Sequence, residues 1–196
     1  MAEPDRDCLL CPRLAAFRDE IRRAHPDWHN APVPSFGAND ARLLIVGLAP
    51  GMHGANRTGR PFTGDYAGDL LYATLLKYGL ARGQYGEDPN DGLSLVDCRI
   101  TNAVRCLPPE NKPVGAEVAN CRPFLTEEIA SMPNLKVILA LGTLAHGAVL
   151  SALAARRSAF SFGHGVFHEL PGDGPILANS YHCSRYNTNT RVLTPT

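Results

Sequence analysis

The sequence predicts an α/β protein with three α/β/α layers around a central, mostly parallel sheet of four strands. Short apolar runs alternate along the chain with longer segments of helical periodicity, which is the pattern of strand–helix–strand units. The chain has 196 residues, of which 44% are hydrophobic and 19% charged. That is the size and composition of one domain with its own core. We therefore expect a single domain over residues 1–196.

The four expected strands are short runs of apolar residues. Residues 42–47 read RLLIVG and residues 136–142 read KVILALG. Both are apolar at nearly every position, as expected for a strand covered by helices on both faces. Residues 94–102 contain another strand, and residues 174–181 the last.

The expected helices follow from apolar residues at helical spacing. The first begins with a proline, which suits a first turn, and the second ends before Gly79, which suits a C-cap. The segments are 12–24, 66–78, 117–132 and 143–154.

Charge and hydropathy exclude several classes of protein. Nineteen basic residues balance nineteen acidic ones, so a surface for a polyanion has to be a local patch. The apolar runs are too short to cross a bilayer, and the polar N-terminus does not resemble a signal peptide. We expect a cytoplasmic protein with no membrane partner.

Four of the six cysteines form a pattern that suits a metal site. Cys8 and Cys11 make a C-x2-C pair, and Cys106 and Cys121 lie far downstream. In an intracellular protein such cysteines more often bind metal than form disulfides. Zinc and an iron–sulfur cluster both accept four thiolates, and the spacing does not separate them.

Turns with many glycine, polar and charged residues follow three of the expected strands, at residues 47–65, 101–105 and 182–190. Ligands of parallel α/β sheets bind at the carboxyl ends of the strands. We therefore expect these turns to share a pocket.

The first turn is rich in glycine but matches neither the dinucleotide nor the P-loop motif. Asp65 stands where this loop becomes a helix, so its position favours an N-cap over a pocket carboxylate. Phe62 suits either the core or a stacking surface for a base. Arg57 and Arg60 are candidate phosphate contacts or solvated side chains, at even odds.

The other two turns carry polar groups whose positions alone favour structural roles. Asn102 either caps a turn or offers the donor and acceptor that match an amide–imide edge such as that of uracil. His182, at the pocket edge, is more often structural in such a place. The hydrogen-bonding run that follows it, including Ser184, Arg185 and Asn187, suits a phosphate backbone.

Four motifs together resemble the iron–sulfur uracil-DNA glycosylases, in particular the family-5 (type B) branch. They are GLAPG-x-HGANRTGRPFTGD at 47–65, ITN-x-V-x-C at 100–106, CRPFL at 121–125 and HxSRxNTxT at 182–190. The resemblance extends from Cys8 to Thr194 with the motifs in family order. Ala49 stands where the family-4 branch has an acidic residue.

The resemblance implies excision of uracil, and of some other deaminated or damaged bases, from DNA by a monomer. It implies a [4Fe–4S] cluster on Cys8, Cys11, Cys106 and Cys121. Asp65 becomes the candidate catalytic carboxylate, with Asp69 as runner-up, and His182 the group that stabilises the departing base. The implied base pocket and DNA contacts are Gly47, Ala49, Gly51, Phe62 and Asn102 for the base, and Arg57, Arg60, Ser184, Arg185 and Asn187 for DNA.

Some features depart from the family pattern, and two other functions compete. Cys183 replaces a usual proline, Tyr186 a glutamine and Arg191 a glycine, all in the loop that would contact DNA. One alternative is a metal-stapled module that binds nucleic acid without excision. Another is a zinc-dependent nucleobase deaminase, but its H-x-E element does not accompany the C-x-x-C pair.

Overall fold

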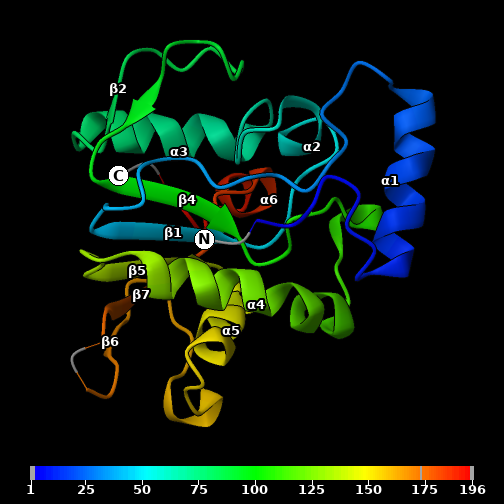
Figure 1. Cartoon of the computed structure of the whole chain (residues 1–196). Helices are drawn as coiled ribbons and strands as arrows, with labels where there is room; N and C mark the ends of the chain where they lie inside the picture. The colour runs from blue at the N-terminus through cyan, green and yellow to red at the C-terminus, as the bar shows by residue number, and fades with distance from the viewer. Residues whose placement is uncertain (1–2, 173, 195–196) are drawn as a thin grey trace.

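The computed structural model describes residues 3–172 and 174–194 (Figure 1). Its helices are α1 (Pro12–Ala24), α2 (Ala55–Thr58), α3 (Tyr66–Lys77), α4 (Gly115–Ser131), α5 (Thr143–Ala152) and α6 (Arg185–Asn189), with 3-10 turns at Pro109–Asn111 and Arg157–Ala159. Its strands are β1 (Leu43–Gly47), β2 (Ala81–Arg82), β3 (Ser94–Leu95), β4 (Cys98–Asn102), β5 (Val137–Leu141), β6 (Phe167–Glu169) and β7 (Ile176–Ser180).

Within the described residues the main sheet has five strands in the order β4-β1-β5-β7-β6. Strands β4, β1, β5 and β7 are parallel, and β6 pairs antiparallel with β7. The predicted three-layer α/β/α architecture is confirmed, but the predicted count of four strands is wrong. Strand β6 has only three residues, too few to produce a periodic signal in the sequence.

The predicted strand over residues 94–102 is divided in two. Asp97 has a φ of +53°, which breaks the extended backbone between β3 and β4. Strand β3 pairs antiparallel with β2 in a small separate hairpin, whereas β4 continues into the main sheet. The hairpin carries a loop, residues 83–93, that lies above α3 in Figure 1.

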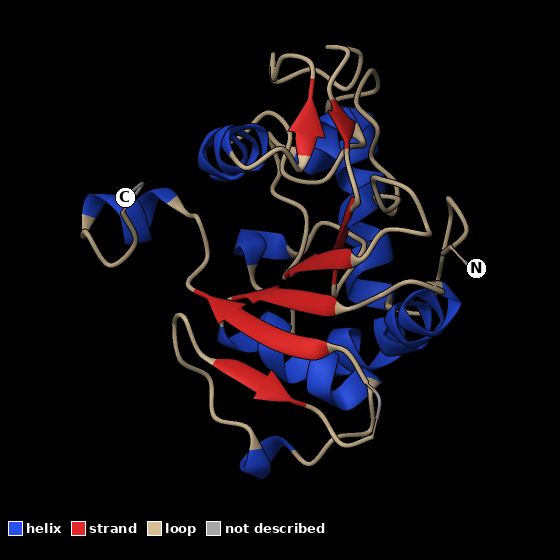
Figure 2. Ribbon diagram, turned by 90° about the vertical axis from the view of Figure 1, so that its left-hand side faces the viewer, coloured by secondary structure: helices blue, strands red, loops and turns tan. Residues whose placement is uncertain are grey.

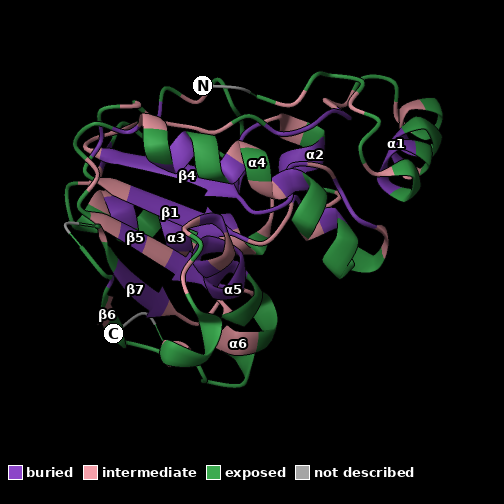
Figure 3. Cartoon of the chain, turned by 60° about the horizontal axis from the view of Figure 1, so that its bottom comes forward, coloured by how far each residue is buried: buried purple, intermediate pink, exposed green. Residues whose placement is uncertain are grey.

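Two apolar cores cover the two faces of the sheet. Along β1, Leu44 and Val46 enter a core with α4 and α5, whereas Ile45 enters a core with α3. All three side chains are fully buried, as the nearly continuous apolar sequence of this strand requires. Figure 3 shows the buried strands between these helical layers.

All four predicted helices are present, and their first and last residues differ from the prediction by at most two positions. Helix α1 has the predicted bounds, and Gly79, one residue beyond the C-cap of α3, has the left-handed φ of +73° that favours glycine. Helix α4 begins two residues earlier than predicted. There the carboxylate of Glu117 accepts a hydrogen bond from the backbone N–H of Val114 at 2.8 Å, which satisfies the first turn.

The strand register brings the expected turns together. Gly47, the last residue of β1, is directly opposite Asn102, the last residue of β4.

None of the helices in the described part of the chain has the length and apolar character needed to span a membrane.

Candidate active site

A pocket of about 460 Å³ opens at the carboxyl ends of the strands. Its walls come from all three predicted turns: residues 48–55, Phe62 and 65–67, then Asn102, and the segment that contains His182, Ser184 and Arg185. The expected shared pocket therefore exists. The structure places the polar groups of distant segments around one cavity.

Asp65 occupies both positions that its sequence context allowed. It is the N-cap of α3, where its Oδ1 accepts from the backbone N–H groups of Ala67 (3.2 Å) and Gly68 (3.3 Å). It also lines the pocket. A Cβ atom added at Gly54 would lie only 2.3 Å from Asp65 Oδ2, and one at Gly51 2.9 Å from it. The glycines thus leave room for the second carboxylate oxygen beside the pocket.

Asn102 is buried, with only 3% of its surface exposed. Its Oδ1 has no hydrogen-bond partner within the described residues, although an unpaired buried acceptor costs about 1–3 kcal/mol. A Cβ at Gly47 would lie 2.4 Å from that oxygen. Glycine is therefore required opposite Asn102, and the free acceptor is available to a ligand in the pocket.

Phe62 lies on the pocket wall next to Asn102. It is 6% exposed and has a φ of +52°, a conformation that is strained for an aromatic residue. A Cβ at Gly47 would be 2.6 Å from its ring. The ring of His182 is 5.8 Å away between centroids, tilted by 31°. Phe62 thus belongs both to the α3-side core and to the pocket.

His182 follows β7 and is partly buried at the pocket edge. Burial lowers the pKa of its imidazole below the ordinary 6.5, and the nearby charge of Asp65 opposes that shift. The lowered pKa favours the neutral ring at neutral pH. A neutral imidazole can donate one hydrogen bond to a ligand without introducing a full charge.

The segment after His182 is held by its own hydrogen bonds. The Ser184 hydroxyl caps α6 by accepting from Asn187 N–H at 3.4 Å, and the Asn187 side-chain amide donates to the carbonyl of His182 at 2.8 Å. The Arg185 guanidinium lies 5.1 Å above the ring of Tyr66. Arg185 is exposed and lines the pocket mouth.

The two arginines of the glycine-rich turn have different environments. Arg57 is exposed, with its Nε–H donating to the carbonyl of His53 at 2.8 Å. Arg60 is 4% exposed and forms two hydrogen bonds with Asp91, of 2.8 and 2.7 Å. This burial corrects the expectation that Arg60 contacts DNA, because its guanidinium is already bound inside the protein.

The four patterned cysteines line one small cavity between α1, α4 and the loop after β4. Leu10, Leu14, Val104 and Phe124 contribute apolar walls to the same cavity. Backbone N–H of Arg105 donates to the sulfur of Cys121 at 3.4 Å. Among the described residues, no three His, Cys, Asp or Glu side chains are close enough to hold a single metal ion. The four cysteines, from the N-terminal segment, the loop after β4 and α4, therefore lie around one cavity.

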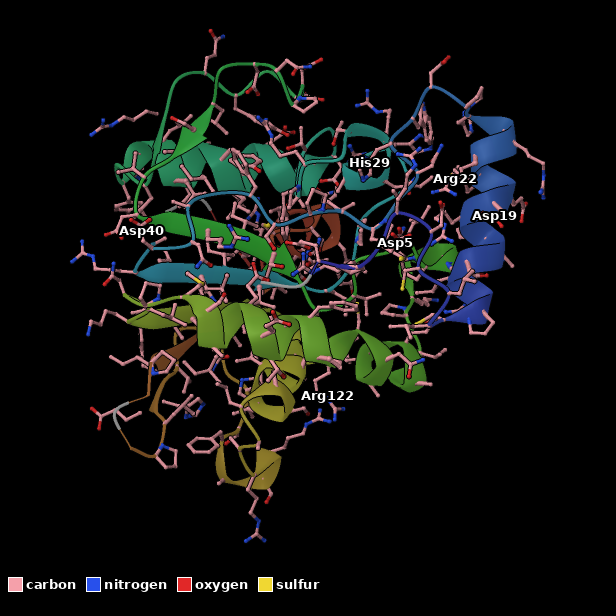
Figure 4. The ribbon with its side chains drawn as sticks, viewed as in Figure 1. Asp5, Asp19, Arg22, His29, Asp40 and Arg122 are labelled. Carbon is pink, nitrogen blue, oxygen red and sulfur yellow. The ribbon has the colours of Figure 1, made fainter. Side chains whose placement is uncertain are left out.

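The N-terminal segment that carries Cys8 is fastened to α1. Arg22 binds the carboxylate of Asp7 at 2.5 Å, and the Arg18 guanidinium donates to the carbonyl of Cys8 at 3.0 Å. Figure 4 shows Arg22 on α1 with Asp5 in the segment beside it. These bonds hold the first cysteine pair near the cavity.

Several pocket residues were not anticipated. Tyr66 lies at the mouth, and Asn111 comes from the 3-10 turn between β4 and α4. Asn111 has a φ of +57°, next to Glu110 at +54°. The sequence signal for this turn was the Pro-Pro-Glu-Asn run itself, which marks a turn but gives no hint that it reaches the pocket.

Comparison with known proteins gives the family. The model of the uracil DNA glycosylase superfamily matches residues 34–196. The chain is 46% identical over 193 residues to a type-5 uracil-DNA glycosylase of Thermus thermophilus, covering 95% of this chain and 87% of that protein. It is 45% identical to the type-5 protein of Mycobacterium bovis (96% and 73% covered) and 40% to that of Pyrobaculum aerophilum (96% and 83%). A type-4 relative from Pyrobaculum aerophilum is 35% identical over 125 residues, covering 63% of this chain and 56% of that protein. The chain belongs to the uracil DNA glycosylase superfamily and, within it, groups with the type-5 enzymes.

Proposed function

We propose that the protein is a uracil-DNA glycosylase that flips uracil out of DNA and hydrolyses its glycosidic bond, leaving an abasic site. The observation that carries the proposal is the buried, unpartnered Oδ1 of Asn102 in the pocket. The oxygen accepts from uracil N3–H while the amide nitrogen donates to O4. Cytosine presents an acceptor at N3 and a donor at the next position, so the same amide orientation rejects it.

Phe62 and the glycines complete the base site. The ring of Phe62 stacks on the flipped base, and stacking of this kind contributes about 1–3 kcal/mol per base. Gly47 leaves room for the Asn102 oxygen and the Phe62 ring, and Ala49 and Gly51 line the pocket with little side chain, which leaves space for a pyrimidine. The pocket thereby supplies both a face and an edge for recognition.

Asp65 and His182 divide the charges that bond cleavage creates. As the bond between C1′ and N1 breaks, its electron pair leaves with uracil and positive charge develops on the sugar. The carboxylate of Asp65 stabilises that charge and orients the water, whose oxygen bonds to C1′ as its proton leaves toward the carboxylate. Neutral His182 donates to uracil O2 and stabilises the anion, in agreement with its lowered pKa.

The mouth of the pocket supplies contacts to the DNA backbone. Arg185 is exposed there, and Ser184 and Asn187 lie in the same C-terminal segment. Arg57 is also exposed but lines a separate surface hollow with Trp28 and His29. Cationic and hydrogen-bonding side chains of this kind position the strand without reading its sequence. They help to offset the unstacking of the flipped nucleotide, which costs a few kcal/mol.

We also propose that Cys8, Cys11, Cys106 and Cys121 hold a [4Fe–4S] cluster. All four cysteines line one small cavity, and a [4Fe–4S] cluster accepts four thiolates, each on a different iron. When bound, the group supplies cross-links between the N-terminal segment, the loop after β4 and α4. No step of the hydrolysis involves it.

Incubation with a uracil-containing duplex, followed by alkaline cleavage of abasic sites, tests the proposed activity. We expect strand breaks at uracil, at hypoxanthine as a second deaminated base, and none at cytosine. Asp65→Asn serves as the matched inactive variant. Tight binding of uracil DNA by the wild-type protein without any excision would instead establish a binding module.

Metal analysis of anaerobically purified protein tests the cluster. We expect four irons per chain and broad visible absorption, both lost in Cys106→Ala together with part of the thermal stability. Stoichiometric zinc without iron contradicts the cluster. Cys98→Ala is the control, since Cys98 lies in the α3-side core and does not line the cavity.

A further inference from the structure

The loop of residues 83–93 is packed on the turn that presents Phe62 and Asp65. Neither the predicted motifs nor the proposed chemistry gives this loop a role. It belongs to the β2–β3 hairpin, which is outside the main sheet. It nonetheless makes an ion pair and several hydrogen bonds with residues 60–64.

The first contact is the ion pair between Arg60 and Asp91. Their side chains are 5% and 6% exposed. The Asp91 carboxylate also accepts from the backbone N–H groups of Gly86 and Leu93, both at 2.9 Å. Arg60 Nε–H donates to the Thr63 hydroxyl at 2.7 Å. The Asp91 carboxylate thus binds backbone groups of the loop and the side chain of Arg60 in the turn at the same time.

The second contact is the hydroxyl of Tyr85. It accepts from the backbone N–H of Gly64 at 3.2 Å and donates to the backbone carbonyl of Phe62 at 3.3 Å. The carbonyl belongs to Phe62, the residue with the strained φ of +52°, and the N–H belongs to Gly64, the residue immediately before Asp65. The guanidinium of Arg60 lies 5.9 Å from the centroid of the Tyr85 ring, so the two contacts support each other.

The space behind the turn is filled on its other side as well. A Cβ added at Gly68 of α3 would lie 1.9 Å from the carbonyl oxygen of Phe62. The Tyr72 hydroxyl donates to the carbonyl of Pro61 at 2.6 Å. The turn is therefore held between α3 and the loop, and its positive φ persists because the surroundings determine it.

From these contacts we infer that Tyr85, Arg60 and Asp91 are positioning residues, which fix the ring of Phe62 and the carboxylate of Asp65 relative to the flipped base. This role rests on the proposed uracil excision, because it concerns residues that position side chains of the same pocket. It replaces the DNA contact expected for Arg60. The residues act through the turn and do not touch the base.

Tyr85→Phe tests the inference because it removes the hydroxyl and keeps the ring. The loss of a typical hydrogen bond, about 0.5–1.5 kcal/mol, corresponds to about a twofold to thirteenfold lower single-turnover rate of uracil excision. Affinity for a duplex with 2′-fluoro-deoxyuridine, whose glycosidic bond resists hydrolysis, falls similarly. Affinity for abasic product DNA stays at the wild-type value, since the base is absent. Tyr78→Phe, on the exposed end of α3, is the matched control.

A second readout does not require activity. We expect faster hydrogen exchange in the peptide that covers residues 60–68 for both Tyr85→Phe and Asp91→Asn. In Tyr85→Phe the Gly64 amide loses its acceptor. In Asp91→Asn the loop loses the carboxylate that binds its backbone and Arg60. Arg60→Lys keeps the positive charge but cannot form the bidentate contact with Asp91. Its excision rate is therefore expected to lie between those of the wild type and Arg60→Ala.

The outcomes separate the two proposals. If the wild-type protein neither excises uracil nor prefers the fluorinated duplex, the proposed function is wrong, whatever the variants do. If the wild type is active and Tyr85→Phe excises at the same rate, the positioning role is wrong. An equal loss of affinity for fluorinated and abasic DNA also overturns it, since that points to a general structural defect.

Discussion

The pocket has two walls that are built differently. The wall with Phe62 and Asn102 is buried, joined to the sheet and supported by the Arg60–Asp91 ion pair. The wall after β7, from Ser184 through α6, has no buried residues in its helix and is held by a few hydrogen bonds and the stack of Arg185 on Tyr66. Figure 2 shows α6 standing away from the sheet.

The difference teaches which part of recognition needs fixed geometry. A hydrogen bond to a base edge fails when the groups shift by a fraction of an ångström, so the base-facing wall lies on buried backbone. Contacts to phosphates tolerate movement because the charges act over a longer range. Segments with few buried contacts open at low free-energy cost, which suits a loop that has to adapt to DNA.

The largest expected effect comes from the carboxylate on the buried wall. Asp65→Ala removes the group that we propose orients water, and a positioned general base contributes about 10²–10⁴-fold in rate. We expect a loss of that order in single-turnover excision, with binding of abasic DNA retained. Melting temperature is measured in parallel, because loss of the N-cap alone costs about 1 kcal/mol.

Asp69→Ala is the control for that prediction. Asp69 lies one turn further along α3, is exposed, and does not line the pocket. Its excision rate is expected to stay close to the wild-type rate. A stable Asp65→Ala protein with a normal rate contradicts both the catalytic and the capping role.

The next effect concerns the base edge. Asn102→Asp replaces the amide donor by an acceptor, so the pairing with uracil O4 is lost while the buried acceptor remains. An unsatisfied buried group costs about 1–3 kcal/mol, which corresponds to a decrease in uracil excision of about fivefold to more than a hundredfold. Asn134→Asp, exposed before β5, controls for the added charge. Unchanged excision in Asn102→Asp contradicts a role of this residue in reading the base.

A smaller effect is expected on the adaptable wall. Arg185→Ala removes one cation from the pocket mouth, so affinity for DNA falls evenly across sequences and the slope of log affinity against log salt decreases by about 1. The single-turnover rate at saturating protein stays near the wild-type value. Arg156→Ala, exposed in the loop after α5, is the control. A changed base preference in Arg185→Ala would place it on the recognition wall instead.

The smallest effect is on stability. Burial holds the pKa of His182 below the ordinary 6.5, so as pH falls below 6.5 the unfolded chain takes up a proton that the folded protein resists. Wild-type stability therefore decreases with falling pH in this window relative to His182→Gln. Denaturant titrations of both proteins at pH 8 and pH 5.5 measure the difference. A wild-type protein that gains stability over His182→Gln at the lower pH contradicts the shift.

Much of the fold could be read from local patterns. The nearly continuous apolar runs around Ile45 and Ile138 predicted buried parallel strands, and the glycine at position 79 predicted a helix end. Strand β6 could not be predicted, because three residues are too few to give a periodic signal and form a strand only by pairing with β7. The break at Asp97 depends on a backbone conformation that its residue type does not require.

The candidate site divides in the same way. The sequence by itself determined the order of the motifs, the small residues that leave space and the chemical types of Asp65, Asn102 and His182. Only the tertiary structure decided that Asp65 is both cap and pocket carboxylate, that Asn102 has a free buried oxygen, and that Arg60 points inward. The physical reason is that burial and partnership are properties of contacts between distant segments. The loop of residues 83–93 shows this most clearly, since Asp91 is an ordinary acidic loop residue until the fold places Arg60 against it.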